Sequence, residues 1–233
     1  MNTFNHYNKE LLNSYISDKV FRDSCILNSD LDFLENTDTE WTNIDISNTN
    51  CNSSIFTNVS MSKCSFFRCS LINSSFKNCR IETTKFLGVS LIKLKILNSR
   101  VDNQIIENCT LQRTQLNNII FNNCHFKDIE AVYSKSQSIS FINCNFSISE
   151  ISGMNGFSCS ELSDIIFYNC HFQGFPLRGA LLKNCSFINC NGEITDDCES
   201  YNTNGIVRFA NPNYLAIKNK KESCEFLKEA LNE

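Results

Sequence analysis

The chain has 233 residues, of which 42% are hydrophobic and 20% charged, so it is long and apolar enough to fold around one sizeable core. Its formal net charge of −4 excludes the strongly basic balance of a nucleic-acid-binding protein, and we expect no direct binding to nucleic acid. No run of about 18 apolar residues is present, which argues against a membrane-spanning helix.

Residues 1–20 form a short N-terminal segment. They lack the basic start and the apolar stretch of a secretory signal peptide, so we expect a cytoplasmic protein. A polar secretion signal of the kind that type III systems use would escape this argument, and secretion into a host cell stays open as the alternative. The apolar residues Leu11, Leu12, Tyr15 and Ile16 predict a short helix that caps the part that follows.

Residues 21–192 repeat with a period of five. In steps of five from Phe21 to Ile151, 25 of 27 positions are apolar, and Asn36 and Ser136 are the exceptions. After Ile151 one extra residue enters, which predicts a register shift with a bulge or small loop at residues 152–156. The series then resumes as Phe157, Leu162, Phe167, Phe172, Leu177, Leu182 and Phe187, and ends at Gly192.

A second column of small residues lies two positions before the apolar one. The residue before the small one is often Asn, whose short side chain tolerates a left-handed backbone and bonds nearby peptide groups. The small residues are Ser24, Ser29, Thr39, Thr49, Ser54, Cys64, Cys69, Ser74, Cys79, Thr84, Ser99, Cys109, Thr114, Cys124, Ser134, Cys144, Ser149, Ser160, Cys170, Ala180, Cys185 and Cys190. The asparagines are Asn73, Asn78, Asn108, Asn118, Asn123, Asn143, Asn169, Asn184 and Asn189.

A period of five fits neither a helix nor an ordinary strand, so the chain must turn once per repeat and stack its repeats into a solenoid. Repeats such as Asn123-Cys124-His125-Phe126 resemble the pentapeptide-repeat family, whose units read small, polar, Leu or Phe and two variable residues. This resemblance implies an all-β solenoid, a right-handed quadrilateral β-helix of eight to nine coils with short helical caps. At the usual strand spacing the helix would be roughly 40 Å long.

The cysteines and the motifs argue against an enzyme. Ten of the 14 cysteines fall on the two inward columns, nine of them on the small one and Cys51 on the large one, where a thiol packs as a small hydrophobe. No C-x-x-C, H-E-x-x-H or G-x-S-x-G motif and no phosphate-binding loop is present, so we expect no catalytic residue, metal or cofactor. The cysteines expected to react with a thiol reagent are Cys25, Cys159, Cys198 and Cys224.

Residues 193–233 leave the five-residue pattern and form a C-terminal capping segment. Cys224, Leu227 and Leu231 lie at helical spacing with Phe226 beside them, which predicts a helix over about 219–232. The tail contains Asn211-Pro212, then Leu215 and Lys218, then Phe226-Leu227-Lys228-Glu229-Ala230-Leu231. In this it resembles the tail of stand-alone pentapeptide-repeat proteins of the quinolone-resistance and microcin-immunity kind. This resemblance implies that Phe226, Leu227 and Leu231 cap the solenoid or join two copies into a homodimer through the C-terminal end.

Charges are unevenly distributed along the repeats. Phe21 to Asp45 contains seven acidic residues and a single basic one, whereas Lys63 to Arg100 contains eight basic residues and a single acidic one. If a coil has about 20 residues, Arg80 and Arg100 stack on one face, with Lys77 and Lys95 on the adjoining face. Together with Lys85 these residues predict a basic patch that binds an acidic protein, although a solvated band of charge is the simpler interpretation.

Two functions remain open. The resemblance to the quinolone-resistance group implies a protein that imitates the shape and charge of DNA, binds DNA gyrase or another topoisomerase, and confers antibiotic resistance. Residues 21–192 contain 15 acidic and 14 basic residues, so the sequence does not predict the uniformly acidic surface that imitation of DNA would need. The alternative is a bacterial type III secreted effector or scaffold, because the Asn-rich and Cys-rich repeats are also similar to the pentapeptide-repeat modules of enterobacterial type III effectors. In this alternative the basic patch of the chain binds a host or bacterial protein.

Overall fold

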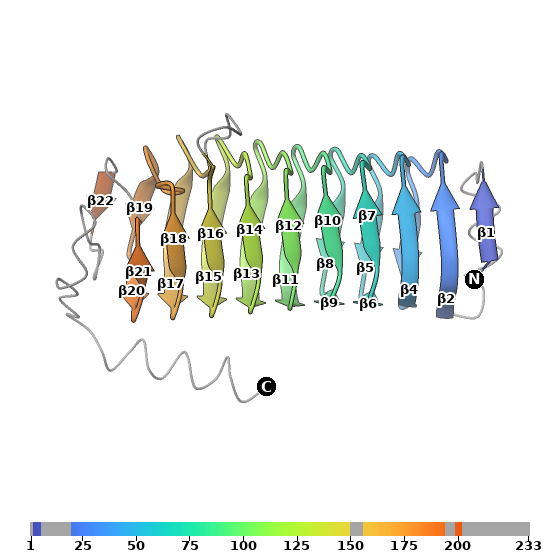
Figure 1. Cartoon of the computed structure of the whole chain (residues 1–233), viewed down its shortest axis with the longest axis horizontal. Coiled ribbons are helices and arrows are strands. Elements are labelled where there is room, and N and C mark those ends of the chain that lie inside the picture. Colours follow the sequence, from blue (N-terminus) through green and yellow to red (C-terminus); the bar gives the residue numbers. More distant parts are fainter. Residues whose placement is uncertain (1, 6–19, 150–155, 194–198, 202–233) are drawn as a thin grey trace.

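The computed structural model describes residues 2–5, 20–149, 156–193 and 199–201, and these form a parallel all-β solenoid of about eight coils (Figure 1). Paired strands lie one coil apart, and most partners are 20 residues apart, as in Phe66 with Phe86 and Phe86 with Ile106. Four five-residue units therefore make one coil, which gives the solenoid four sides, here named A to D in chain order. No helix occurs among the described residues.

The strands of one side stack on one another along the whole solenoid. Side D has no named strand and is joined by isolated bridges such as Asp30 with Asn50. Strands that turn a corner serve two sides: β2 (Val20–Leu27) and β4 (Glu40–Ser47) serve B and C, whereas β11 (Lys95–Asp102), β13 (Gln115–Asn122), β15 (Lys135–Ile142) and β17 (Glu161–Tyr168) serve A and B. Side A also has β3 (Glu35–Thr37), β5 (Ile55–Thr57), β8 (Ser75–Lys77), β19 (Leu181–Lys183) and β22 (Glu199–Tyr201). Side B adds β6 (Ser60–Ser62), β9 (Arg80–Glu82) and β20 (Ser186–Ile188). Side C adds β1 (Asn2–Asn5), β7 (Ser65–Phe67), β10 (Lys85–Leu87), β12 (Ile105–Glu107), β14 (His125–Lys127), β16 (Asn145–Ser147), β18 (His171–Gln173) and β21 (Asn191–Gly192).

The five-residue series forms the core, as predicted. Its described members from Phe21 to Phe187 are buried, apart from Ile96, which is partly buried. Equivalent rings in neighbouring coils stack nearly parallel, with centroids 4.6 Å apart for Phe56 and Phe76 and 4.9 Å for Phe126 and Phe146. The polar exceptions Asn36 and Ser136 also point inward, so position in the repeat decides burial more strongly than polarity does.

The small column is also buried, and its polar atoms bond the backbone across coils. Cys64 Sγ donates to the carbonyl of Ser62 in its own coil and to that of Trp41 in the preceding coil, at 3.5 and 3.6 Å. Ser149 is the exception. It was predicted to point inward but is exposed, and its N–H and Oγ both donate to Oδ1 of Asp128.

The corners use the asparagines as predicted. Asn78 has a φ of +54°, and the other asparagines predicted at this offset also have a positive φ. Their side chains form ladders along the edges of the solenoid, since Asn123 Nδ2 donates to Asn103 Oδ1 at 2.7 Å and Asn118 Nδ2 to Asn98 Oδ1 at 3.1 Å. Asparagine thus supplies both the turn and a contact between coils.

The register shift is larger than predicted. Glu130 pairs with Gly156 and Ser136 with Leu162, so partners here lie 26 residues apart and the coil contains six additional residues instead of one. Phe157 occupies the place that Ile151 was predicted to fill, and residues 150–155 are outside the described part. The chain re-enters the solenoid at Gly156, where a Cβ would lie 2.3 Å from the carbonyl oxygen of Pro176.

Strands cover both ends of the described solenoid. β1 pairs in parallel with the C-side half of β2, and β22 pairs with β19. The predicted N-terminal helix with Leu11 and Ile16 and the predicted helix over 219–232 both lie outside the described residues. A neighbouring strand satisfies the unpaired backbone groups of an edge, so β1 and β22 act as caps.

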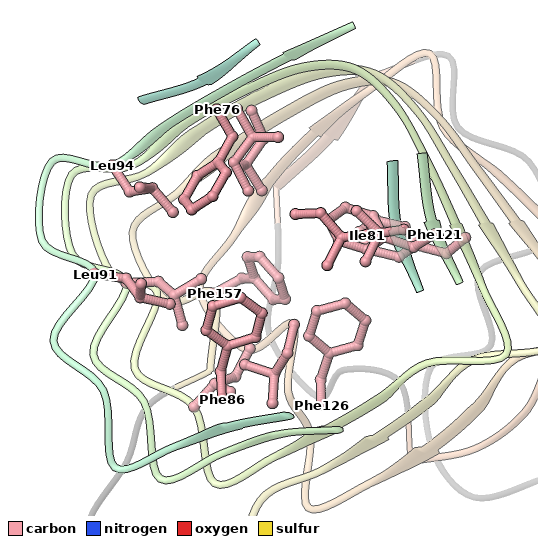
Figure 2. A pocket seen from close by; sticks show the side chains of 15 residues that line it. Phe76, Ile81, Phe86, Leu91, Leu94, Phe121, Phe126 and Phe157 are labelled. Atoms are coloured by element: carbon pink, nitrogen blue, oxygen red, sulfur yellow. The ribbon is translucent and has the colours of Figure 1, made fainter. Parts of the chain in front are cut away.

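A cavity of about 40 Å³ lies in the middle of the solenoid (Figure 2). It forms where the inward side chains become smaller from one coil to the next, since Ile96 follows Phe76 in one column and Val101 follows Ile81 in another. Its lining includes Leu91, Leu111 and Leu116 and contributes no polar surface. The cavity therefore has no group that could bind a polar substrate.

Candidate protein-binding surface

The five predicted basic residues lie on three sides of neighbouring coils. Arg80 and Arg100 are register partners on side B. Lys77 and Lys95 lie on side A in neighbouring strands, although Lys77 pairs with Leu97 and Lys95 with Ser75. Lys85 lies on side C, away from the side A lysines. We call these five residues the basic surface.

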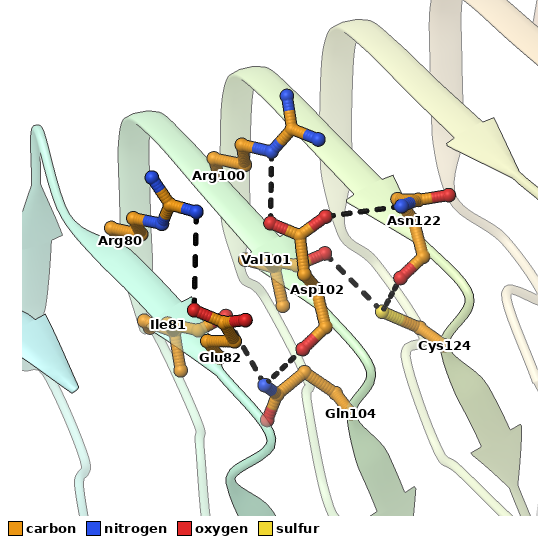
Figure 3. Close-up of polar contacts among 9 residues, drawn as sticks. All are labelled: Arg80, Ile81, Glu82, Arg100, Val101, Asp102, Gln104, Asn122 and Cys124. Carbon is orange, nitrogen blue, oxygen red and sulfur yellow. Dashed lines mark hydrogen bonds and ion pairs between the residues drawn. The ribbon is translucent and has the colours of Figure 1, made fainter. Parts of the chain in front are cut away.

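Carboxylates that the sequence analysis did not include accompany both arginines (Figure 3). Nε of Arg100 lies 2.8 Å from Oδ2 of Asp102, and a guanidinium nitrogen of Arg80 lies 3.9 Å from Glu82. Residues two apart in a strand point to the same side, so the spacing in the sequence could have revealed both pairs. Ion pairs of this kind contribute about 0–1 kcal/mol at a surface, but they reduce the positive charge of side B.

Asp102 joins two neighbouring coils of side B. Its side chain is largely buried, and it accepts hydrogen bonds from Arg100 and from Nδ2 of Asn122 at 3.1 Å. Below it, Gln104 fills a small-column position, and its Nε2 donates to the carbonyls of Asp102 at 2.7 Å and Ile81 at 3.1 Å. The amide thus makes the two contacts that a cysteine makes elsewhere, and it fixes the backbone that carries Arg100 and Asp102.

The lysines of the basic surface differ from the arginines, because no carboxylate of the described residues pairs with them. Lys77, Lys85 and Lys95 are exposed, and none has an ion-pair partner in the described part of the chain. The strongest available attraction for an acidic partner therefore comes from the lysines on sides A and C, and less from the arginines on side B.

Exposed apolar side chains lie beside the lysine of side C. Phe67 is 39% exposed, pairs with Leu87, and carries the guanidinium of Arg68 at 4.9 Å from its ring centroid. Ile105, 36% exposed, is the register partner of Lys85. Phe67 directly follows Phe66, a member of the buried series. Because successive side chains of a strand point to opposite faces, the sequence predicts that the ring of Phe67 points outward. Aromatic and apolar groups beside cations are typical of protein interfaces.

The cysteines behave mainly as packing residues. All ten predicted to point inward are buried, whereas Cys159 is exposed and Cys25 is partly buried; Cys198 and Cys224 are outside the described part. Burial raises the pKa of Cys64 and of Cys109 from 9.0 to about 11, which keeps both thiols protonated. Among the described residues no group of three or more His, Cys, Asp or Glu side chains could hold a metal ion.

A known family model matches part of the repeats. The described repeats are five-residue units that wind four to a coil, and a family model described as pentapeptide repeats matches residues 44–82 with eight copies. Residues 44–82 therefore consist of pentapeptide repeats. A search of curated proteins finds no match to the chain. No helix among the residues described here is long and apolar enough to cross a membrane.

Solved structures similar to this chain include HetL, a pentapeptide-repeat protein involved in heterocyst differentiation regulation from the cyanobacterium Nostoc sp. strain PCC 7120. It is 12% identical, with 89% of this chain and 98% of HetL covered and a TM-score of 0.46. A trypsin-treated form of QnrB1, a plasmid-mediated fluoroquinolone resistance protein, is 12% identical over 92% of this chain and 90% of its own, with a TM-score of 0.45. The A-module of the Azotobacter vinelandii mannuronan C-5 epimerase AlgE4 is 8% identical over 79% of this chain and 70% of its own, with a TM-score of 0.36.

Proposed function

We propose that this protein has no catalytic activity and binds another protein through the outward side chains of its solenoid. The observation that supports this proposal is the division of the repeat into packed inward positions and outward positions that are in most coils at least partly exposed, among which the basic surface is a chemically distinctive group. Pentapeptide-repeat proteins generally act as structural or binding proteins.

The basic surface favours an acidic protein partner. Lys77 and Lys95 present unpaired charge on side A, and Lys85 does so on side C beside Ile105 and close to Phe67. A surface that combines cations with exposed apolar groups can attract an acidic partner at a distance and exclude water at the contact. Such a partner suits the effector or scaffold function, with either a host or a bacterial protein as target.

The acidic first coils support the other proposal, a topoisomerase-binding protein. Seven carboxylates from Asp23 to Asp45 lie within little more than one coil, an axial length of about 5–10 Å. Duplex DNA carries one charge per about 1.7 Å, so the charge density at this end is comparable with that of DNA. The basic residues from Lys63 onwards reverse the charge, so imitation of DNA would be confined to the N-terminal coils.

A supercoiling assay tests the topoisomerase proposal. DNA gyrase is incubated with relaxed plasmid, with and without a quinolone, and with micromolar protein. Inhibited supercoiling or relief of quinolone poisoning is the expected result, and Asp23→Lys with Asp38→Lys should weaken it. Unchanged gyrase activity in both conditions would remove this partner.

Partner capture tests the basic surface. Bacterial and host lysates are passed over the immobilised protein and over a Lys77→Glu/Lys95→Glu variant, and retained proteins are identified. We expect an acidic protein that the wild type retains and the variant loses. Lys135→Glu is the matched control, because Lys135 is also exposed on side A, two coils beyond Lys95. Equal retention by the wild type and the double variant would exclude this surface.

A further inference from the structure

Side B of the last coils carries outward-facing apolar residues. Ile142 packs with Tyr168, its register partner, and Tyr168 in turn pairs with Ile188. Each of the three directly follows an inward phenylalanine, so the alternation of a strand turns them outward. Together with Ile120 and Ile166 on the same side, they form a surface that we call the isoleucine patch, which comprises Ile120, Ile142, Ile166, Tyr168 and Ile188.

This patch is far less exposed than its outward position predicts. Ile142 is 1% exposed and Ile188 is 7% exposed. Thr42 and Ser62 occupy the same outward column in earlier coils and remain partly exposed, although each has strand neighbours on both sides. Asp102 of this column is also buried, but it contacts Arg100 and Asn122 through its carboxylate. Stacking between strands therefore does not by itself bury a side chain of this column.

Ser140 indicates the chemistry of what covers the patch. It lies in the outward column between Ile120 and Ile166, yet it is 1% exposed, and its Oγ is buried without a hydrogen-bond partner. A polar cover would offer such a hydroxyl a partner, because an unsatisfied buried hydroxyl is unfavourable. The cover is therefore apolar where it meets Ser140.

The chain itself supplies a segment at the right place. In every coil side A leads directly to side B, as β17 does between Glu161 and Tyr168. β22 lies on side A at the end of the solenoid, and Tyr201 pairs with Lys183, the last residue of side A before the corner that leads to Ser186 and Ile188 on side B. Residues 202–233 then remain, and their sequence predicts a helix with Phe226, Leu227 and Leu231 on its apolar face.

The dimensions of the two partners agree. From the coil of Ile120 to the coil of Ile188 the patch spans three coil steps, about 15 Å at the usual strand spacing. A helix over residues 219–232 would be about 21 Å long, enough to cover it. We propose that residues 202–233 dock onto the isoleucine patch through Phe226, Leu227 and Leu231, along side B of the solenoid instead of across its end.

Hydrogen exchange of the full-length protein tests the proposal. Backbone amides of residues 219–232 should be protected in the wild type, and Ile142→Asp should reduce this protection at least tenfold. Thr42→Asp is the matched control, because Thr42 occupies the same outward column five coils earlier, and it should leave the protection unchanged. Unprotected amides in the wild type, or equal protection in a folded Ile142→Asp variant, would overturn the proposal.

Variants of the tail decide the matter even if Ile142→Asp does not fold. Leu227→Asp with Leu231→Asp leaves the solenoid intact and should uncover the patch, so binding of an apolar fluorescent dye should rise several-fold. No rise would contradict docking. A second copy of the chain is the rival occupant: protection that disappears on dilution, together with dissociation of a dimer in sedimentation, would overturn intramolecular docking.

Discussion

Asn78 Nδ2 donates a hydrogen bond to Oδ1 of Asn58, 3.1 Å away, at the equivalent corner of the preceding coil. Asn58 in turn donates to Asp38 at 2.8 Å, so the contact continues for three coils along one edge. The same residues have a left-handed backbone, which most side chains adopt at a cost of about 1–2 kcal/mol. One residue type thus turns the chain and links successive coils.

Replacement of Asn78 should separate these two roles. Asn78→Val forces a β-branched residue into a positive φ and removes the hydrogen bond, so we expect a loss of about 1–2 kcal/mol in the free energy of unfolding. Asn78→Gly keeps the backbone conformation accessible and should change stability by less than about 1 kcal/mol. Urea unfolding measures both changes.

Asn117→Val is the control for this pair. Asn117 is exposed within β13, where a β-branched residue is favourable, so we expect little change. If Asn78→Val were as stable as Asn117→Val, the left-handed corner would not determine the choice of asparagine.

Replacement by alanine should change the stability of the protein in opposite directions at two serines of one coil. Ser136 is buried and its Oγ has no hydrogen-bond partner. Ser134 is equally buried, but its Oγ donates to the carbonyl of Leu111 at 2.8 Å and accepts from the N–H of Thr114 at 3.1 Å. We expect Ser136→Ala to stabilise the protein by about 1 kcal/mol and Ser134→Ala to destabilise it by about 1–3 kcal/mol.

Thermal unfolding of the two serine variants provides the measurement. Both remove one oxygen atom from the same coil, so a difference in volume does not explain a difference in sign. Equal shifts of the melting temperature in the same direction would show that hydrogen bonding at the small column does not decide its residue type.

The five-residue period was sufficient to predict the core, including the inward positions of Asn36 and Ser136. It could not give the length of the insertion before Phe157. Six residues and one residue shift a five-residue pattern by the same phase, so the two are indistinguishable until strand partners are known. Ser149, just before this insertion, was wrongly placed inside for the same reason.

Outward positions are less predictable because packing does not constrain them. The stacking of Arg80 and Arg100 followed from a coil of 20 residues, but their partners Glu82 and Asp102 were missed. The isoleucine patch was missed as well. Ile142, Tyr168 and Ile188 are register partners separated by 26 and 20 residues in the sequence, and they come together only through the register of the coils.

The cavity provides a third prediction. Val101 lines it and lies between Ile81 and Phe121, so Val101→Ile places one methylene group into empty space. We expect a gain of about 1 kcal/mol in the free energy of unfolding from the additional apolar burial. Urea unfolding of the variant and the wild type measures this difference.

Val89→Ile is its control. Val89 is 1% exposed and does not line the cavity, so the same added group should overpack the core and destabilise by about 1–3 kcal/mol. If both variants lost stability, the cavity would be too narrow to accept a methylene group.

The buried thiols predict a loss of stability at alkaline pH. The pKa of Cys64 and of Cys109 rises from 9.0 to about 11 in the folded protein, mainly because burial disfavours the thiolate. Below pH 9 both states keep the proton, and the stabilising contribution is complete. Between pH 9 and 11 the unfolded chain releases protons that the folded chain retains, so the free energy of unfolding falls as pH rises, by up to about 1.4 kcal/mol per pH unit for each thiol.

Cys64→Ala isolates this effect from the titration of lysine and tyrosine side chains. Urea unfolding under reducing conditions at pH 8, 9 and 10 should give a shallower loss of stability for the variant than for the wild type. Identical slopes for Cys64→Ala and the wild type would mean that the thiol stays protonated or ionises equally in both states, contrary to a burial-raised pKa.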